Sequence, residues 1–179
     1  MILRETYDKN DLALIRNLYL KAFPSNERKP FPIILQKCKE GSMEILKIED
    51  KKQTFIGLVI MILYKDLAIL DYFAIDEAKR NCGSGSQVLS LLNERYHDKR
   101  MILEIENPDV PSDNTAERIR RKGFYLRNGM VLMPFQVDLF GVEMLILTNG
   151  KSVTFEEYHN IFINVFSPLI SNNIRLIKK

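Results

Sequence analysis

Residues 70–86, LDYFAIDEAKRNCGSGS, carry the strongest indication of the fold of this chain. This stretch begins as an apolar strand, continues as a charged loop with the pattern Arg80-x-x-Gly83-x-Gly85, and ends where an amphipathic helix begins. The two glycines let the main chain approach a ligand closely. A helix start adds unpaired N–H groups and the positive end of a dipole. The stretch therefore predicts a cradle for a phosphate or pyrophosphate group.

Two other phosphate-binding loops are excluded by the residues next to these glycines. A P-loop needs Lys and then Ser or Thr after its last glycine, whereas Ser86 and Gln87 follow Gly85. A dinucleotide-binding loop needs a third glycine or alanine, and Val88 occupies that position. A tight turn that binds nothing is the alternative that the two glycines alone leave open.

The chain ahead of this loop reads as two helices and an antiparallel sheet. Helical spacing of apolar residues follows a helix start at Asn10-Asp11, and Pro24 ends that helix. Short charged turns separate long runs of Ile, Val and Leu, which is typical of a meander of strands. The expected helices are 10–22 and 33–40, and the expected strands are 2–4, 43–48, 55–64 and 67–75.

Behind the loop, helices and strands alternate before a final hairpin. A strand, a helix and a further strand predict a parallel pair, 67–75 with 101–105. Thr154 and Glu157 form a capping-box signature that opens a last helix, which we expect to end at Pro168. The remaining expected elements are a helix after Gly85, a helix over 114–127, strands over 130–139 and 142–147, and a short strand over 174–177.

Composition places the chain among ordinary globular proteins. It has 179 residues, 46% hydrophobic and 27% charged, with a net charge of +3, which argues against a disordered chain. The longest apolar run, 55–64, is too short to span a membrane. The only cysteines, Cys38 and Cys82, cannot form a disulfide framework or a cysteine zinc cluster. We expect a cytoplasmic protein without a metal.

Two motifs in this order resemble the GNAT family of N-acetyltransferases. Arg80–Gly85 is similar to the family's Arg/Gln-x-x-Gly-x-Gly/Ala pyrophosphate loop, and the stretch 124–130, FYLRNGM, is similar to its Phe-Tyr-x-x-x-Gly-Phe helix end. The resemblance runs from Ile2 to about Leu147. It implies an α+β fold with a central mixed sheet, an antiparallel N-terminal meander, a splayed parallel pair, flanking helices and a C-terminal hairpin, here followed by an extra helix.

One acetyltransferase-like domain is expected over 1–179, with its core over 1–147 and a C-terminal helix and tail over 151–179. The resemblance implies acetyl-CoA as cosubstrate, bound in the cleft between the parallel strands, and direct acetyl transfer to an amine of a small molecule, peptide or protein. The implied binding residues are Phe73, Ala74 and Ile75 for the pantetheine arm and Arg80, Asn81, Cys82, Gly83, Ser84, Gly85 and Ser86 for the pyrophosphate. A non-catalytic acyl-CoA sensor or interaction module on the same fold is the alternative.

Catalytic roles follow partly from the resemblance and partly from the residues. The position of Tyr125 matches the family tyrosine that donates a proton to the coenzyme sulfur. Asp71 is a lone acid in an apolar strand, where a charge is costly unless it is solvated or paired, and many relatives carry a glutamate there. Asp71 is therefore the first candidate for the base that deprotonates the amine, with Glu104 and Glu106 as rivals. Pairing of each acid with Lys or Arg, and deprotonation through water, stay open.

The remaining charged and aromatic residues indicate little about partners. Many relatives carry an asparagine seven residues before the tyrosine, and Arg118 occupies that position here. We expect the basic run 118–127 to form a solvated helix face, and we expect neither a nucleic-acid nor a membrane partner. His97 and His159 are expected at the surface.

The acceptor pocket should be walled by 23–31 and the hairpin 130–147, and a homodimer stays open.

Overall fold

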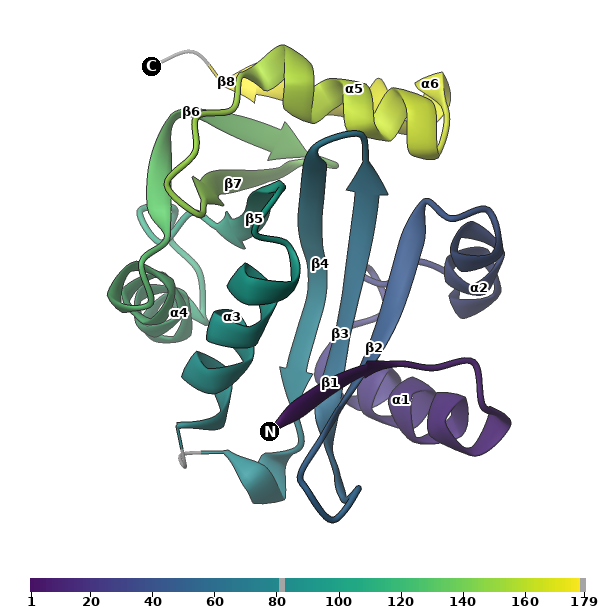
Figure 1. The fold of residues 1–179 in the computed structure, drawn as a ribbon. Helices are drawn as coiled ribbons and strands as arrows, with labels where there is room; N and C mark the ends of the chain where they lie inside the picture. Colours follow the sequence, from purple (N-terminus) through teal and green to yellow (C-terminus); the bar gives the residue numbers. More distant parts are fainter. Residues whose placement is uncertain (81–82, 178–179) are drawn as a thin grey trace. The chain divides into compact units, whose positions relative to one another are not determined.

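The computed structural model describes residues 1–80 and 83–177, so Asn81, Cys82, Lys178 and Lys179 lie outside the described residues. The strands are β1 (Ile2–Glu5), β2 (Met43–Glu49), β3 (Phe55–Tyr64), β4 (Leu67–Ile75), β5 (Arg100–Glu106), β6 (Val131–Leu139), β7 (Val142–Thr148) and β8 (Ile174–Ile177). The helices are α1 (Lys9–Ala22), α2 (Phe31–Lys39), α3 (Ser84–Arg95), α4 (Thr115–Arg127), α5 (Phe155–Val165) and α6 (Pro168–Ser171), with a short 3₁₀ turn, η1 (Glu77–Lys79) (Figure 1).

The described strands form one mixed sheet in the order β1-β2-β3-β4-β5-β7-β6-β8, in which β4 and β5 are the parallel pair. This confirms the expected α+β fold with an N-terminal meander, a parallel pair and a C-terminal hairpin. By its contacts the chain divides into two compact units, 1–63 with 69–97 and 64–68 with 98–179. The expectation of a single domain stays a prediction.

In the first unit, β1, β2 and β3 are antiparallel, and β2 and β3 together with β4 and the helices supply the core. β2 and all but the ends of β3 are buried, which matches the long apolar runs in the sequence. Helix α2 packs against β2, and α3 contacts β1. Helix α1 begins one residue earlier than expected, because the carboxylate of Asp8 accepts hydrogen bonds from the N–H groups of Asn10 and Asp11.

A buried cluster of charges joins β1, α1 and β2. The Lys47 ammonium lies 2.8 Å from Asp11 Oδ1 and 2.8 Å from Glu49 Oε2. Arg4 completes the cluster, because its Nε contacts Glu49 and its Nη2 contacts Asp11, both at 2.9 Å. The Thr6 hydroxyl also donates to Asp11. Every carboxylate in the cluster has cationic partners, as buried charges require.

As the pH falls, the fold is expected to lose the stabilisation that this cluster provides. The hydrogen bond from Lys47 holds the pKa of Asp11 below its ordinary value, against the opposing effect of burial, and Arg4 does the same for Glu49. A carboxyl group with a lowered folded pKa stabilises the fold above its unfolded pKa, and this is lost as the pH falls through the folded pKa. The free energy of unfolding, measured by urea denaturation, should therefore decrease below about pH 5.

The control for this pH effect is the double variant Asp11→Asn/Glu49→Gln. It removes both titrating groups, so its free energy of unfolding should change less with pH than that of the unchanged chain. Equal pH slopes for the two proteins would contradict the assignment of acid sensitivity to this cluster.

The second unit pairs β5 with β7, β7 with β6 and β6 with β8, all antiparallel. The capping box of Thr154 and Glu157 opens α5 as expected. Pro168 was expected to end this helix, but α5 ends at Val165, and Pro168 is the first residue of the short α6, with Ser167 as its cap. Proline fits the first helical position because its missing N–H would have no partner there.

The expected short strand over 174–177 exists as β8, and it adds a third strand to the C-terminal hairpin. Leu139 of β6 pairs with Ile174, and Gln136 pairs with Ile177. None of the described helices combines the length and the hydropathy that a membrane span requires.

Candidate active site

The predicted phosphate loop follows β4 and leads directly into α3. Gly83 precedes the helix in the left-handed conformation, with φ of +72°, and a Cβ placed on it would meet no atom within 4 Å. Within residues 1–80 and 83–177, no side chain caps helix α3, and its first turn contains no acidic residue. Its first N–H groups and the positive end of its dipole therefore fit an anion such as a pyrophosphate.

Side chains before the loop fix its position. The Asp76 carboxylate accepts from the N–H of Ala78, and Arg80 Nε donates to the carbonyl of Ile75 at 3.0 Å. The Ser84 hydroxyl donates back to the carbonyl of Lys79. The loop is thus held from both ends within the described residues. The predicted roles of Asn81 and Cys82 concern residues that lie outside this description.

The end of β4 carries the residues expected to pair with a pantetheine arm, Phe73, Ala74 and Ile75. Strand β3 lies very close to this end, because a Cβ on Gly57 would stand 2.2 Å from the carbonyl oxygen of Ala74. The N–H of Asp76 donates to the carbonyl of Ile56 at 2.8 Å. Glycine at 57 therefore permits the close approach of the two strands. The pairing with pantetheine stays a prediction.

Asp71, the first candidate for the base, lies on β4 with only 6% of its side chain exposed. Its Oδ1 is 2.7 Å from the ammonium of Lys29. Its Oδ2 is buried and, within the described part of the chain, accepts no hydrogen bond. A buried oxygen without a partner costs free energy, so it calls for a functional or solvent partner.

The loop that contains Lys29 is fixed by two tyrosines. The N–H of Lys29 donates to the Tyr72 hydroxyl at 2.9 Å, and that hydroxyl donates to the carbonyl of Glu27. The Tyr19 hydroxyl donates to the carbonyl of Lys29. The rings of Tyr19 and Phe23 both meet the ring of Tyr72 edge-on, at 4.8 and 4.9 Å between centroids. These contacts hold the Lys29 ammonium against Asp71.

The two rival acids on β5 are both engaged. The Tyr158 hydroxyl donates to Glu104 at 2.7 Å. Arg118 Nη2 donates to Glu106 at 2.6 Å, and Arg121 lies 3.5 Å from the same carboxylate. Glu106 thus has the arginine pairing that the sequence left open, whereas Glu104 accepts from a tyrosine. Neither glutamate stands out as a base.

Arg118 corrects one expectation from the sequence. The basic run was expected to form a solvated helix face, but only 11% of the Arg118 side chain is exposed. Its pairing with Glu106 explains its burial, since a buried guanidinium requires a carboxylate partner. The alternation of Glu104 and Glu106 on β5 pointed to one face of the strand, yet no sequence signal indicated which helix would cover it.

Tyr125, the candidate acid, lies partly buried near the end of α4. Burial raises the pKa of its hydroxyl to about 12, against the opposing charge of Arg121. The hydroxyl is therefore protonated at neutral pH and can act as a donor. No hydrogen bond to it occurs within residues 1–80 and 83–177. The N–H groups of Asn128 and Met130 both donate to the Tyr125 carbonyl at 3.1 Å, which fixes the helix end.

The histidines and possible metal ligands add no further chemistry to this site. His97 is exposed, and one of its ring nitrogens contacts the carbonyl of Glu94. His159 is only partly exposed, because it stacks on Phe155 and contacts the carbonyl of Ser171. Across the described ranges, no three His, Cys, Asp or Glu side chains are grouped so that they could hold a metal ion.

Comparison with solved structures identifies the fold. A Bacteroides thetaiotaomicron protein, provisionally assigned to the GNAT acetyltransferases, superposes with a TM-score of 0.78 at 20% identity, covering 96% of this chain and 99% of that one. A Vibrio cholerae spermidine N-acetyltransferase, in complex with CoA and spermine, superposes with a TM-score of 0.64 at 14% identity, covering 88% of this chain and 96% of that one. No family model and no curated protein sequence matches the chain.

The chain therefore has the GNAT acetyltransferase fold. The order of its strands and the glycine loop between β4 and α3 agree with the resemblance noted in the sequence. At 20% identity or less, the comparison establishes the fold and leaves the activity to be argued from the residues.

Proposed function

We propose that this protein is an acetyl-CoA-dependent N-acetyltransferase that transfers the acetyl group directly to an amine. The observation that carries the proposal is the uncapped start of α3 behind a left-handed Gly83, on a GNAT fold. This arrangement offers main-chain N–H groups to a pyrophosphate, and among the described residues no atom lies within 4 Å of a Cβ placed on Gly83.

The reaction sets three demands on the residues. The attacking amine must be neutral, so a base has to accept its proton, directly or through water. The oxyanion formed from the thioester carbonyl needs a hydrogen-bond donor. The departing thiolate benefits from a proton. We assign the base to Asp71 and the acid to Tyr125, and we assign coenzyme binding to the main chain of Phe73–Ile75 and of the loop 80–86.

Gly83→Ala is expected to weaken acetyl-CoA binding about tenfold or more, because alanine disfavours φ of +72° and moves the N–H groups of the loop. For the unchanged chain, acetyl-CoA at 100 times its Kd should raise the free energy of unfolding by about 2.7 kcal/mol. Thermal denaturation with increasing acetyl-CoA measures both effects. Absence of any stabilisation at saturating coenzyme would contradict the proposed function.

Gly41→Ala is the matched control for this variant. Gly41 has nearly the same conformation, with φ of +74°, but it lies at the end of α2. Both substitutions carry the same backbone strain, so only Gly83→Ala should lower the affinity for acetyl-CoA. An equal loss in both variants would assign the effect to stability rather than to binding.

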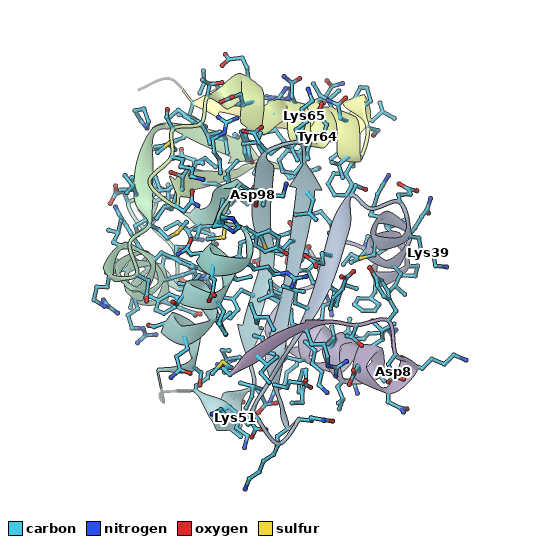
Figure 2. All side chains as sticks on the ribbon, viewed as in Figure 1. Asp8, Lys39, Lys51, Tyr64, Lys65 and Asp98 are labelled. Atoms are coloured by element: carbon cyan, nitrogen blue, oxygen red, sulfur yellow. The ribbon has the colours of Figure 1, made fainter. Side chains whose placement is uncertain are left out.

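Asp71→Asn is expected to lower acetyl transfer roughly 100-fold, because the amide keeps the shape of the carboxylate but cannot accept a proton. The free Oδ2 of Asp71 supports this role, since Lys29 occupies Oδ1 only. The measurement is thiol release from acetyl-CoA with a screen of amines, amino acids and peptides. Asp98→Asn, at an exposed acid labelled in Figure 2, is the control. An unchanged rate for Asp71→Asn would leave deprotonation to water.

A non-catalytic acyl-CoA sensor is the second candidate function, and the contacts of the candidate bases favour it. Each of the three candidate bases is engaged by a neighbour: Asp71 by Lys29, Glu104 by Tyr158, and Glu106 by Arg118. A non-catalytic acyl-CoA sensor would need no free base. It would bind acetyl-CoA with the stabilisation described above, yet release no thiol with any amine in the screen.

A further inference from the structure

A cavity of about 240 Å³ lies in the first unit, between the end of α1 and the start of α2. It is lined in part by the 23–31 segment that was expected to wall the acceptor pocket. Of its nine described lining residues, three are cations, Arg16, Arg28 and Lys29, and none is acidic. A site for a polycation would be lined by acidic residues, so this cavity has the opposite charge.

The two arginines supply the positive charge of the cavity that no described carboxylate neutralises. The ammonium of Lys29 is neutralised by Asp71 at 2.7 Å. Arg28 donates from Nη1 to the carbonyl of Leu20 at 3.1 Å, which orients its guanidinium and leaves other N–H groups of the fork available. Among the residues described, neither Arg16 nor Arg28 forms an ion pair with a carboxylate. A guanidinium fork of this kind matches carboxylate and phosphate groups.

The rest of the lining is largely apolar and rigid. Tyr19 and Phe31 are buried, and their rings lie 5.8 Å apart. Pro30 and Pro32 restrict the backbone on one side of the cavity. The volume is below the roughly 300 Å³ from which sites for drug-sized ligands start, so the cavity accommodates a small group.

From this lining we infer that the cavity binds the anionic group, carboxylate or phosphate, of a small amine that the protein acetylates. The inference rests on the proposed acetyltransferase function and adds the class of acceptor to it. A polyamine would bring its cations against Arg16 and Arg28, which is unfavourable. The acceptors of this chain are therefore amines that carry an acidic group. The Vibrio cholerae enzyme, in contrast, is named after spermidine, which is a polyamine.

The test uses four probes that share the alanyl α-amine and differ in the charge of the second side chain. They are the amides of alanyl-glutamate, alanyl-phosphoserine, alanyl-glutamine and alanyl-lysine. Binding to the full chain is followed by chemical-shift changes of backbone amides. The probes with glutamate and phosphoserine should shift the amides around Tyr19 and Phe31. They should bind about tenfold more tightly than the probe with the uncharged glutamine side chain. The ratio of glutamate to phosphoserine affinity distinguishes the two anion sources.

The variant Arg16→Gln/Arg28→Gln should weaken binding of the acidic probes about tenfold or more and leave the neutral probe unchanged. Lys9→Gln/Lys39→Gln is the control, because it removes the same charge from exposed positions of α1 and α2 that do not line the cavity. Figure 2 shows Lys39 extending from α2 into solvent. Thermal melts confirm that both variants are folded.

Three outcomes separate the two proposals. Selective binding of acidic probes, lost in the arginine variant, together with their acetylation supports the inference. Equal binding of all probes, or acetylation of polyamines alone, overturns it and leaves the acetyltransferase function standing. Selective binding of acidic probes, with no thiol release from acetyl-CoA for these probes or for any amine of the screen, supports an anion site but overturns the proposed function and the acceptor assignment that rests on it.

Discussion

Tyr125→Phe is expected to slow acetyl transfer by about 100-fold or more while the affinity for acetyl-CoA stays the same. Phenylalanine keeps the ring and its packing on Phe124, where the centroids lie 5.1 Å apart. It removes only the hydroxyl, which is protonated at neutral pH and whose pKa burial raises to about 12. If this hydroxyl protonates the leaving thiolate, the loss appears in kcat and not in KM.

The matched control is Tyr64→Phe, which removes a hydroxyl from a partly exposed tyrosine outside α4 (Figure 2). Its kcat should stay within about twofold of the unchanged chain, since surface substitutions away from a site have small effects. Thermal melting of both variants separates loss of catalysis from loss of folding. An unchanged kcat for Tyr125→Phe would remove this residue from the acid role, whatever the control does.

Lys47→Met should lower the free energy of unfolding at neutral pH by about 3 kcal/mol. Methionine fills similar space, but it leaves the carboxylates of Asp11 and Glu49 buried with Arg4 as their main cation. Because 43% of the Arg4 side chain is exposed, solvent weakens its attraction for them. Urea denaturation gives the size of the loss, and Lys51→Met, at an exposed lysine, should cost less than about 0.5 kcal/mol.

Lys47→Met is also expected to change how the free energy of unfolding depends on pH. Without Lys47 the two carboxyl groups are harder to ionise, so the penalty should shrink as the pH falls and they become protonated. Replacing the cluster by apolar residues, as in Asp11→Leu/Lys47→Met/Glu49→Leu, should recover most of the lost stability. A penalty that is the same at pH 7 and at low pH would show that lost packing, rather than unpaired charge, causes it.

Much of the local structure could be predicted from the sequence. The bounds of β3 and β4, the capping box of α5 and the glycine loop before α3 are where the patterns placed them. These features depend on residues close together in the chain: alternating apolar residues, side chains that cap nearby N–H groups, and glycines at positive φ. The errors at Asp8 and Pro168 were also local, and each came from choosing the wrong residue as a helix boundary.

The order of the elements and the mixed sheet were therefore predictable from the sequence, and so was the position of the candidate anion cradle. The pairing of charged groups, in contrast, was not predictable, because it depends on the tertiary fold. Lys29 and Asp71 are 42 residues apart, and Tyr158 lies 54 residues from Glu104. Strand alternation fixes the face on which an acid lies, but the helix or loop that covers this face is chosen by packing over the whole chain. For the same reason the arginine-lined cavity could not be read from the sequence.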